Sequence, residues 1–393
     1  MTTMLDIGTT APAAPLGTGP DRRGSWIPTP AMIATRIMEL RKRRGLMIAL
    51  LVVNIGIPTL FLAIRLLSHA IDPKSYGPAG GYSIYLALVA GVMYVFGFIV
   101  AATLGCTAGS VDLSDGMFRH LVVTGRSRLA LYLARIPAGL AIVVPLVAIG
   151  FTVVCAVCVF AAPTPLNYDG VNVPVNLSRL GFESWAANHE HEVICDLPYN
   201  IGPSSSIATV VSSVPCGPNG PPQGGKQAPA VQPSPQPSRA QLRNAARVIA
   251  RMDYADYSRQ FLYPSDSLMI KSGLWLELEA VIGFVVGLGL ASLLGQRTVA
   301  VVLMIVLEII LTPIMSTHVI PHLINIQRGV VGLATAHLEP GGLPLVFGGG
   351  GGGPPGSRAL LVPESTTVAV CVIVAWLVVW TGLGAWRMMT RDA

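Results

Sequence analysis

Long uninterrupted runs of hydrophobic residues dominate the pattern along this chain. A helix crosses a bilayer with about 20 apolar residues, and six runs are long enough to do so. They cover residues 46–67, 83–105, 137–161, 276–294, 298–317 and 367–386. None alternates in the way of a barrel strand, and only a helix or a closed barrel satisfies the backbone in lipid. The pattern therefore predicts an all-α polytopic membrane protein with about six transmembrane helices.

Composition indicates that lipid is the solvent for much of this protein. Of its 393 residues, 52% are hydrophobic and only 12% are charged. A soluble domain carries about 25% charged residues. The polar surface is therefore too small to solvate a soluble protein of this length. The same numbers exclude the disordered, coiled-coil and disulfide-scaffold classes.

Basic residues between the runs predict the orientation, because short cytoplasmic segments are enriched in Lys and Arg. They precede the first run and follow the second, fourth and sixth runs. The residues are Arg22, Arg23, Arg36, Arg41, Lys42, Arg43, Arg44, Arg119, Arg126, Arg128, Arg135, Arg297, Arg387 and Arg391. We expect both termini to be cytoplasmic and the protein to lie in the plasma membrane. The net charge of +6 then reflects this topology and anionic lipid, not nucleic acid.

The runs divide the chain into four parts. Residues 1–28 are expected to be a disordered cytoplasmic tail. Residues 29–162 form the first half of the transmembrane domain, including a cytoplasmic loop at 106–136. Residues 163–273 are expected to be a large insertion on the outer face, between the third and fourth spans. Residues 274–393 form the second half.

Two outer segments have their own expected features. Residues 217–238 are rich in Pro, Gly, Gln and Ser, which is typical of an extended linker. Residues 239–257 read as a helix, with Ser238 as its N-cap. The outer segment 318–366 begins with a moderately apolar stretch that either re-enters the membrane or lies at its interface. Its glycine run at 348–353 is expected to be a flexible tether.

Cys195 and Cys216 are the two cysteines that lie outside the hydrophobic runs and their flanks. Two thiols on one extracytoplasmic unit are expected to pair, because that compartment is oxidising. The sequence therefore predicts a Cys195–Cys216 disulfide.

An amphipathic helix is predicted just before the first span. Thr29 is a candidate cap, and Pro30 suits the first helical position. The helix would lie along the cytoplasmic interface with its basic end against lipid headgroups. Its polar residues are Arg36, Glu39, Arg41, Lys42 and Arg43. The alternative is an ordinary basic flank of the first span.

Two cytoplasmic motifs carry a family resemblance. The first is E-L-R-K-R-R-G at 39–45, and the second is D-L-S-D-G-M-F-R-H-L-V-V-T-G-R-S-R at 112–128. With six spans, they resemble the membrane subunit of type-2 ABC exporters. The resemblance implies a connecting helix for the first motif and, for the second, a coupling helix that docks on an ATP-binding subunit. The implied coupling residues are Asp112, Gly116, Phe118, Arg119, Thr124, Gly125, Arg126 and Arg128.

The resemblance also sets the expected partners and cofactors. The chain contains no G-x-x-x-x-G-K-[ST] loop, because Gly224-Gly225-Lys226 is followed by Gln227. We therefore expect no ATPase site, no catalytic residue and no cofactor bound by this chain. ATP and Mg²⁺ would bind to a separate ATP-binding cassette subunit. A second copy of the chain, or a homologous permease, would complete the transporter for an unidentified amphipathic or hydrophobic substrate.

Acidic residues in the spans are the candidates for a translocation path or gate. Glu308 lies near the centre of the fifth run, where a charge that faces lipid is costly. Glu277 and Glu279 lie near the outer mouth of the fourth run. The alternative for Glu308 is a protonated or hydrogen-bonded packing residue. No metal site is expected, since His189 and His191 are two residues apart and H-E-x-x-H needs four.

Two other functional classes stay open from the sequence. A secondary transporter would need paired intramembrane charges or broken helices in repeated halves. A non-transporting scaffold or receptor would use the outer insertion for binding and the cytoplasmic loop for docking.

Overall fold

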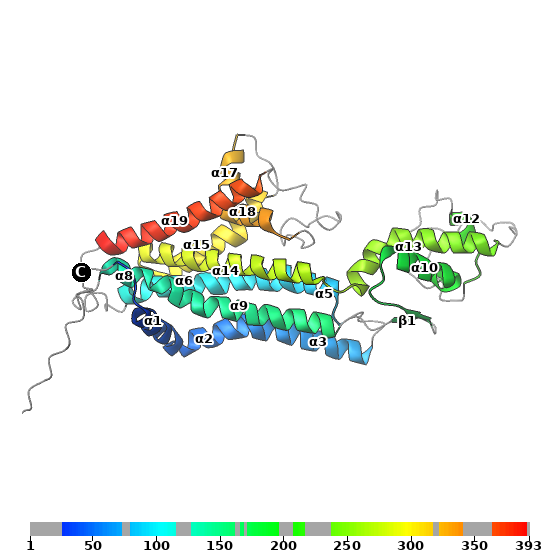
Figure 1. The fold of residues 1–393 in the computed structure, drawn as a ribbon, viewed down its shortest axis with the longest axis horizontal. Coiled ribbons are helices and arrows are strands. Elements are labelled where there is room, and N and C mark those ends of the chain that lie inside the picture. Colours follow the sequence, from blue (N-terminus) through cyan, green and yellow to red (C-terminus); the bar gives the residue numbers. More distant parts are fainter. Residues whose placement is uncertain are drawn as a thin grey trace, which may run out of the picture.

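The computed structural model describes residues 26–72, 79–114, 127–161, 166–168, 171–195, 207–216, 237–316, 322–340 and 364–390. These residues are mostly helical, as the hydrophobic pattern predicts. Figure 1 shows a long helical bundle with a smaller unit beyond one end. We call the described residues between 166 and 261 the module. The opposite end of the bundle, where α1 (Pro30–Lys42) lies, is the α1 end.

Five helices are long and apolar enough to cross a membrane. They are Arg44–Ile71, Ile84–Val111, Arg128–Phe160, Asp266–Leu294 and Thr366–Thr390. Each overlaps one predicted span, so the architecture fits a helical membrane protein. The predicted span 298–317 overlaps α15 (Arg297–Ile305), the π-helical segment η3 (Val306–Leu311) and α16 (Thr312–Ser316), which follow one another directly. That this sixth segment crosses the membrane stays a prediction.

The membrane helices are built from shorter elements. They are α2 (Arg44–Leu51), η1 (Val52–Gly56) and α3 (Ile57–Ile71), then α5 (Tyr82–Leu86), η2 (Ala87–Met93) and α6 (Tyr94–Ser114), then α8 (Arg128–Leu133) and α9 (Arg135–Phe160), and finally α14 (Asp266–Leu294) and α19 (Thr366–Thr390). The π-helical segments η1 and η2 widen two of these helices, and η3 lies within the sixth segment. Such segments occur frequently at functional sites.

Helix α14 is the centre of the bundle. In its most apolar stretch 72% of the residues are buried, compared with 22% in α19, and it packs against α6, α9, α15 and α19. It begins at Asp266, well before the predicted start at 276, because Ser265 caps it by accepting a hydrogen bond from the backbone of Leu268. It ends at Leu294, and the next residue, Gly295, has a φ of 72° and forms the left-handed cap that glycine favours.

Glycines bring α6 and α14 into close contact. A Cβ at Gly105 would collide with the carbonyl oxygen of Phe284. A Cβ at Gly109 would lie 2.5 Å from the carbonyl oxygen of Leu288, and one at Gly287 would lie 2.8 Å from that of Ala102. Small residues at such contacts are the usual means of helix association in lipid, where hydrophobicity does not drive it. This interface fixes the position of the central helix.

Between α16 and α19, the described residues form two short helices, α17 (Ile324–Arg328) and α18 (Val331–Leu338). Most of α18 is buried, and it packs against α19, α16 and α14. The Trp376 indole of α19 donates a 2.8 Å hydrogen bond to the carbonyl of Gly329, between the two short helices. The apolar residues of α18 therefore pack on protein, whereas Leu323 and Ile326 at α17 are exposed.

The module has a hydrophobic core of its own. It contains α10 (Arg179–Asn188), α11 (Glu190–Cys195), α12 (Ala208–Ser212) and α13 (Arg239–Phe261). A small antiparallel hairpin of β1 (Leu166–Tyr168) and β2 (Val171–Val173) adds strands that the all-α prediction lacked. The predicted Cys195–Cys216 disulfide is confirmed. Ser238 caps α13 as predicted: its hydroxyl accepts from the backbone amide of Gln241, and its own amide donates to Oε1 of Gln241. The helix ends at Phe261.

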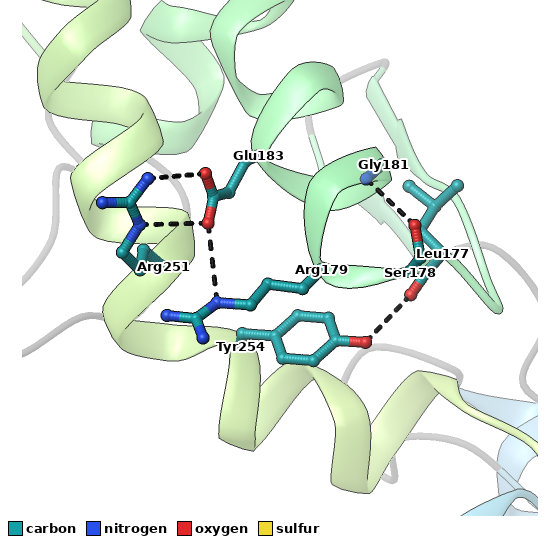
Figure 2. Close-up of polar contacts among 7 residues, drawn as sticks. All are labelled: Leu177, Ser178, Arg179, Gly181, Glu183, Arg251 and Tyr254. Atoms are coloured by element: carbon teal, nitrogen blue, oxygen red, sulfur yellow. Dashed lines mark hydrogen bonds and ion pairs between the residues drawn. The ribbon is translucent and has the colours of Figure 1, made fainter.

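A carboxylate joins two helices of the module. Glu183 of α10 accepts hydrogen bonds of 3.0 and 2.8 Å from Nε and an Nη atom of Arg251 on α13. Arg179 lies 3.5 Å from the same carboxylate, as Figure 2 shows. Beside this pair, the Tyr254 hydroxyl donates to the carbonyl of Leu177. The hydrogen bonds from Arg251 lower the pKa of Glu183, the positive charges of Arg179 and Arg247 act in the same direction, and burial opposes them.

We predict that acid weakens the module through Glu183. Because its pKa is lowered in the folded state, the stabilisation is complete above the ordinary Glu pKa of about 4.3 and is lost as pH falls through the lowered value. Resistance of the module to proteolysis in the full chain should therefore drop in acid. Glu183→Gln should lower it at neutral pH and flatten the pH dependence. Glu190→Gln on α11 is the matched control, and an equal effect there would contradict the assignment.

We predict that Gly105→Val disrupts the bundle, whereas Gly382→Val on α19 does not. The first places methyl groups against the backbone of α14, and the second points into open space. Overpacking of this kind costs about 3 kcal/mol or more when backbone must shift. Melting of the purified protein in detergent, followed by size-exclusion chromatography, measures the difference. Equal melting temperatures would show that the close helix contact is dispensable.

Candidate functional site

The implied coupling residues flank the gap between α6 and α8. Asp112 lies in the last turn of α6, and Arg128 begins α8. Six others lie outside the described residues: Gly116, Phe118, Arg119, Thr124, Gly125 and Arg126. The end of α6, the start of α8 and the C-terminal end of α19 all lie at the α1 end of the bundle, opposite the module (Figure 1).

Hydrogen bonds from three side chains connect the helices at this end of the bundle. Arg128 donates a 3.1 Å hydrogen bond to the carbonyl of Met389, in the last turn of α19. Arg135 of α9 is buried and donates at 3.1 Å to the carbonyl of Gly109 on α6. The Ser292 hydroxyl of α14 donates to the same carbonyl at 3.3 Å. The start of the α8–α9 helix therefore contacts α19, α6 and, through Gly109, α14.

The helix predicted before the first span is present as α1 and packs against α9. Its place at the membrane interface stays a prediction. Pro30 is its first residue, as predicted, but the Thr29 side chain does not cap it, which corrects the expected capping. Instead the Thr29 carbonyl accepts the first helical hydrogen bonds. Arg36 and Glu39 form an ion pair of 2.6 Å. The basic residues Arg41 and Lys42 are exposed in the last turn, and Arg43 is half-buried at the C-cap.

A second candidate site lies inside the bundle, around Glu308 on η3. Only 3% of Glu308 is exposed. The hydroxyl of Tyr94, the first residue of α6 after η2, donates a hydrogen bond of 2.5 Å to its Oε1 atom. The Tyr94 ring stacks on Trp275 of α14 with a centroid distance of 5.1 Å. The Trp275 indole donates to the carbonyl of Thr335 on α18 at 3.1 Å. Four segments of the chain therefore meet at this carboxyl group.

Two further carboxyl groups belong to this cluster. Glu279 of α14 and Glu339, directly after α18, are 2% and 6% exposed. Both are close enough to Tyr94 to interact with it electrostatically, as Glu308 is. Glu279 also interacts with Glu308, Glu339 and the Thr335 side chain. We call Tyr94, Glu279, Glu308 and Glu339 the acid cluster.

Gly332 makes room for the acid cluster. A Cβ at this position of α18 would lie 2.5 Å from Oγ1 of Thr312 and 2.9 Å from Oε2 of Glu308. Any larger residue would therefore push α18 away from η3. The absence of a side chain at residue 332 allows the short helix to close over Glu308.

The carboxyl groups of the acid cluster destabilise the folded protein unless their charge is neutralised. In the described part of the chain, Oε1 of Glu279 and Oε2 of Glu308 make no hydrogen bond. Unpaired carboxylates at this depth in a membrane protein cost several kcal/mol each. Across the described ranges, no three His, Cys, Asp or Glu residues are arranged to hold a metal ion. The chemistry that the cluster can support is binding and release of a proton.

The structure separates the predicted path residues. Glu279 joins Glu308 in the acid cluster, because α14 begins upstream of the predicted span and places residue 279 near its middle. Glu277 is half-buried two residues earlier, so it lies on a different face of the helix. Sequence reasoning missed Tyr94, Trp275, Thr335 and Glu339. No local spacing could reveal them, since Tyr94 and Glu308 are 214 residues apart.

In comparisons with protein-family models, curated proteins and solved structures, no match to this chain was found. The candidate sites therefore rest on their own geometry.

We predict that Tyr94→Phe destabilises the bundle. It removes the donor to Glu308 and leaves a buried carboxyl group unpaired, at a cost of about 1–3 kcal/mol. Tyr132→Phe on α8 is the matched control, since that hydroxyl is buried but makes no hydrogen bond within the described residues. Thermal melting in detergent should fall for the first variant and stay unchanged for the second. An unchanged melting temperature for Tyr94→Phe would show that the Tyr94 hydroxyl contributes nothing.

Proposed function

We propose that this chain is the membrane-spanning subunit of an ATP-binding-cassette exporter. ATP and Mg²⁺ would bind to a separate cassette subunit, and a second permease copy would complete the transport path. The substrate class we expect is amphipathic or hydrophobic. The observation that carries the proposal is the gathering of α1, the two flanks of segment 115–126 and the end of α19 at one end of the bundle (Figure 1). In this proposal that end faces the cytoplasm.

The contacts of Arg128 and Arg135 support a mechanical role for this end. A partner that pushes on the segment before α8 would act on α19 through the Arg128–Met389 bond and on α6 through the Arg135–Gly109 bond. Because Ser292 of α14 also bonds Gly109, the push would reach the central helix. Rigid-body tilting of packed helices is a common way to convert such contacts into opening of a path.

The acid cluster favours a second candidate function, a proton-coupled secondary transporter. Such a protein needs paired intramembrane carboxyl groups that face a protein interior. Glu279, Glu308 and Glu339 meet this requirement better than the lone Glu308 expected from the sequence. The sequence contains no repeated halves, so the exporter subunit remains the function that we put first.

We predict that the purified chain brings an ATPase with it. A gentle-detergent pull-down of the wild type should recover ATP hydrolysis, and Arg128→Glu should reduce or uncouple it by roughly tenfold while expression is intact. Arg126→Glu is expected to act in the same way. Lys271→Glu, an exposed charge reversal near the start of α14, is the control.

Two outcomes would overturn this proposal. One is wild-type ATPase recovery and coupling in both arginine variants, which would remove the coupling role of the 112–128 segment. The other is the recovery of no ATPase together with solute movement by the isolated protein down a proton gradient. The latter result would favour the secondary transporter, and Glu308→Gln should then abolish that movement.

A further inference from the structure

One face of the module carries a row of arginines. Arg239, Arg243, Arg247 and Arg251 follow one another at intervals of four residues along α13. All four are exposed, and four residues of helix rise about 6 Å. Ala245, Ala246, Ile249 and Ala250 of the same helix are buried in the module core. The row is therefore held on the outside by the packing of the helix.

Most of the positive charge in this row is not neutralised. Glu183 pairs with Arg251 and Arg179 (Figure 2), so these two guanidinium groups share one carboxylate. Within the residues that the structure describes, no ion pair involves Arg239, Arg243 or Arg247. Like charges four residues apart destabilise a helix. An anionic ligand would remove this repulsion.

We propose that the arginine row of α13 is a binding site for a linear polyanion with repeating phosphate groups. A guanidinium fork donates two parallel hydrogen bonds to a phosphate, which a lysine ammonium cannot do. Each step of four residues turns the next arginine by about 40°. A tetrahedral phosphate presents oxygens in several directions and suits this turn, whereas a carboxylate presents two oxygens in one plane.

The orientation of α13 favours a polymer over a lipid surface. Figure 1 shows α13 running roughly along the long axis of the bundle, beyond its end. A membrane that surrounds the bundle would therefore meet the row end-on. Headgroups could reach only the arginine nearest the bundle, while a flexible chain can follow the whole row, about 18 Å from Arg239 to Arg251. This inference does not depend on the proposed exporter function.

The test places a fluorophore beside the row on the full-length protein in detergent. An Asn244→Cys variant carries the label, with exposed Cys371 changed to Ser. Long-chain inorganic polyphosphate is titrated, with orthophosphate at equal total phosphate as a comparison. We expect saturable binding of polyphosphate that weakens as salt is raised, and little response to orthophosphate. Arg243→Gln with Arg247→Gln should weaken binding by about tenfold or more.

Controls separate this site from general attraction between charges. Arg41→Gln with Lys42→Gln removes two charges from α1 and should leave the signal unchanged. Arg243→Lys with Arg247→Lys keeps the charge but loses the forks, and should give an intermediate loss even if the glutamine variant folds poorly. No polyphosphate response, or an unchanged response in both row variants, would overturn the proposal. So would an equal response to phosphatidylglycerol vesicles, which would make the ligand a lipid surface.

Discussion

The close approach of α6 and α14 is the contact on which the rest of this structure depends. Gly105, Gly109 and Gly287 let the two backbones meet, and lipid offers no hydrophobic force that could replace such packing. Because α14 is held at the centre, its polar residues lie next to polar groups of α6. Glu279 lies beside Tyr94, and Ser292 reaches the carbonyl of Gly109. Both candidate sites therefore depend on the same glycine interface.

Buried polar groups are arranged differently at the two candidate sites of the bundle. At the α1 end, Arg135 and Ser292 share one backbone carbonyl, so charge and dipole are paired. In the acid cluster the carboxyl groups lie together, and Tyr94 donates to one of them. At such unpaired buried oxygens, binding of a proton or movement of a helix has the largest effect on the free energy of the folded state. The π-helical segments η2 and η3 lie at this cluster, and such segments occur frequently at functional sites.

The module is a separate core joined to the bundle at its base. The chain continues from α13 into α14, and the backbone amide of Tyr82, at the start of α5, donates to the carbonyl of Leu262 at 2.9 Å. The module is braced internally by the Glu183–Arg251 pair and the disulfide. A ligand bound along α13 would therefore act on two membrane helices at once, through α14 and through α5.

The sequence by itself determined the features that depend on neighbouring residues. The apolar runs predict the helices that could cross a membrane, Ser238 predicts the start of α13, and two isolated cysteines predict the disulfide. The apolar runs predict helix starts less well, because a capping residue can extend a helix beyond its run. Ser265 caps α14 well before the predicted start at 276, whereas the Thr29 side chain does not cap α1.

Only the tertiary structure decided which polar residues meet. Tyr94 and Glu308 are remote in the chain, and Glu339 lies outside the apolar runs. Whether a buried carboxyl group is a packing residue or part of a site depends on the groups that face it. Those groups come from other helices, brought there by contacts between glycines and backbone that no local pattern encodes.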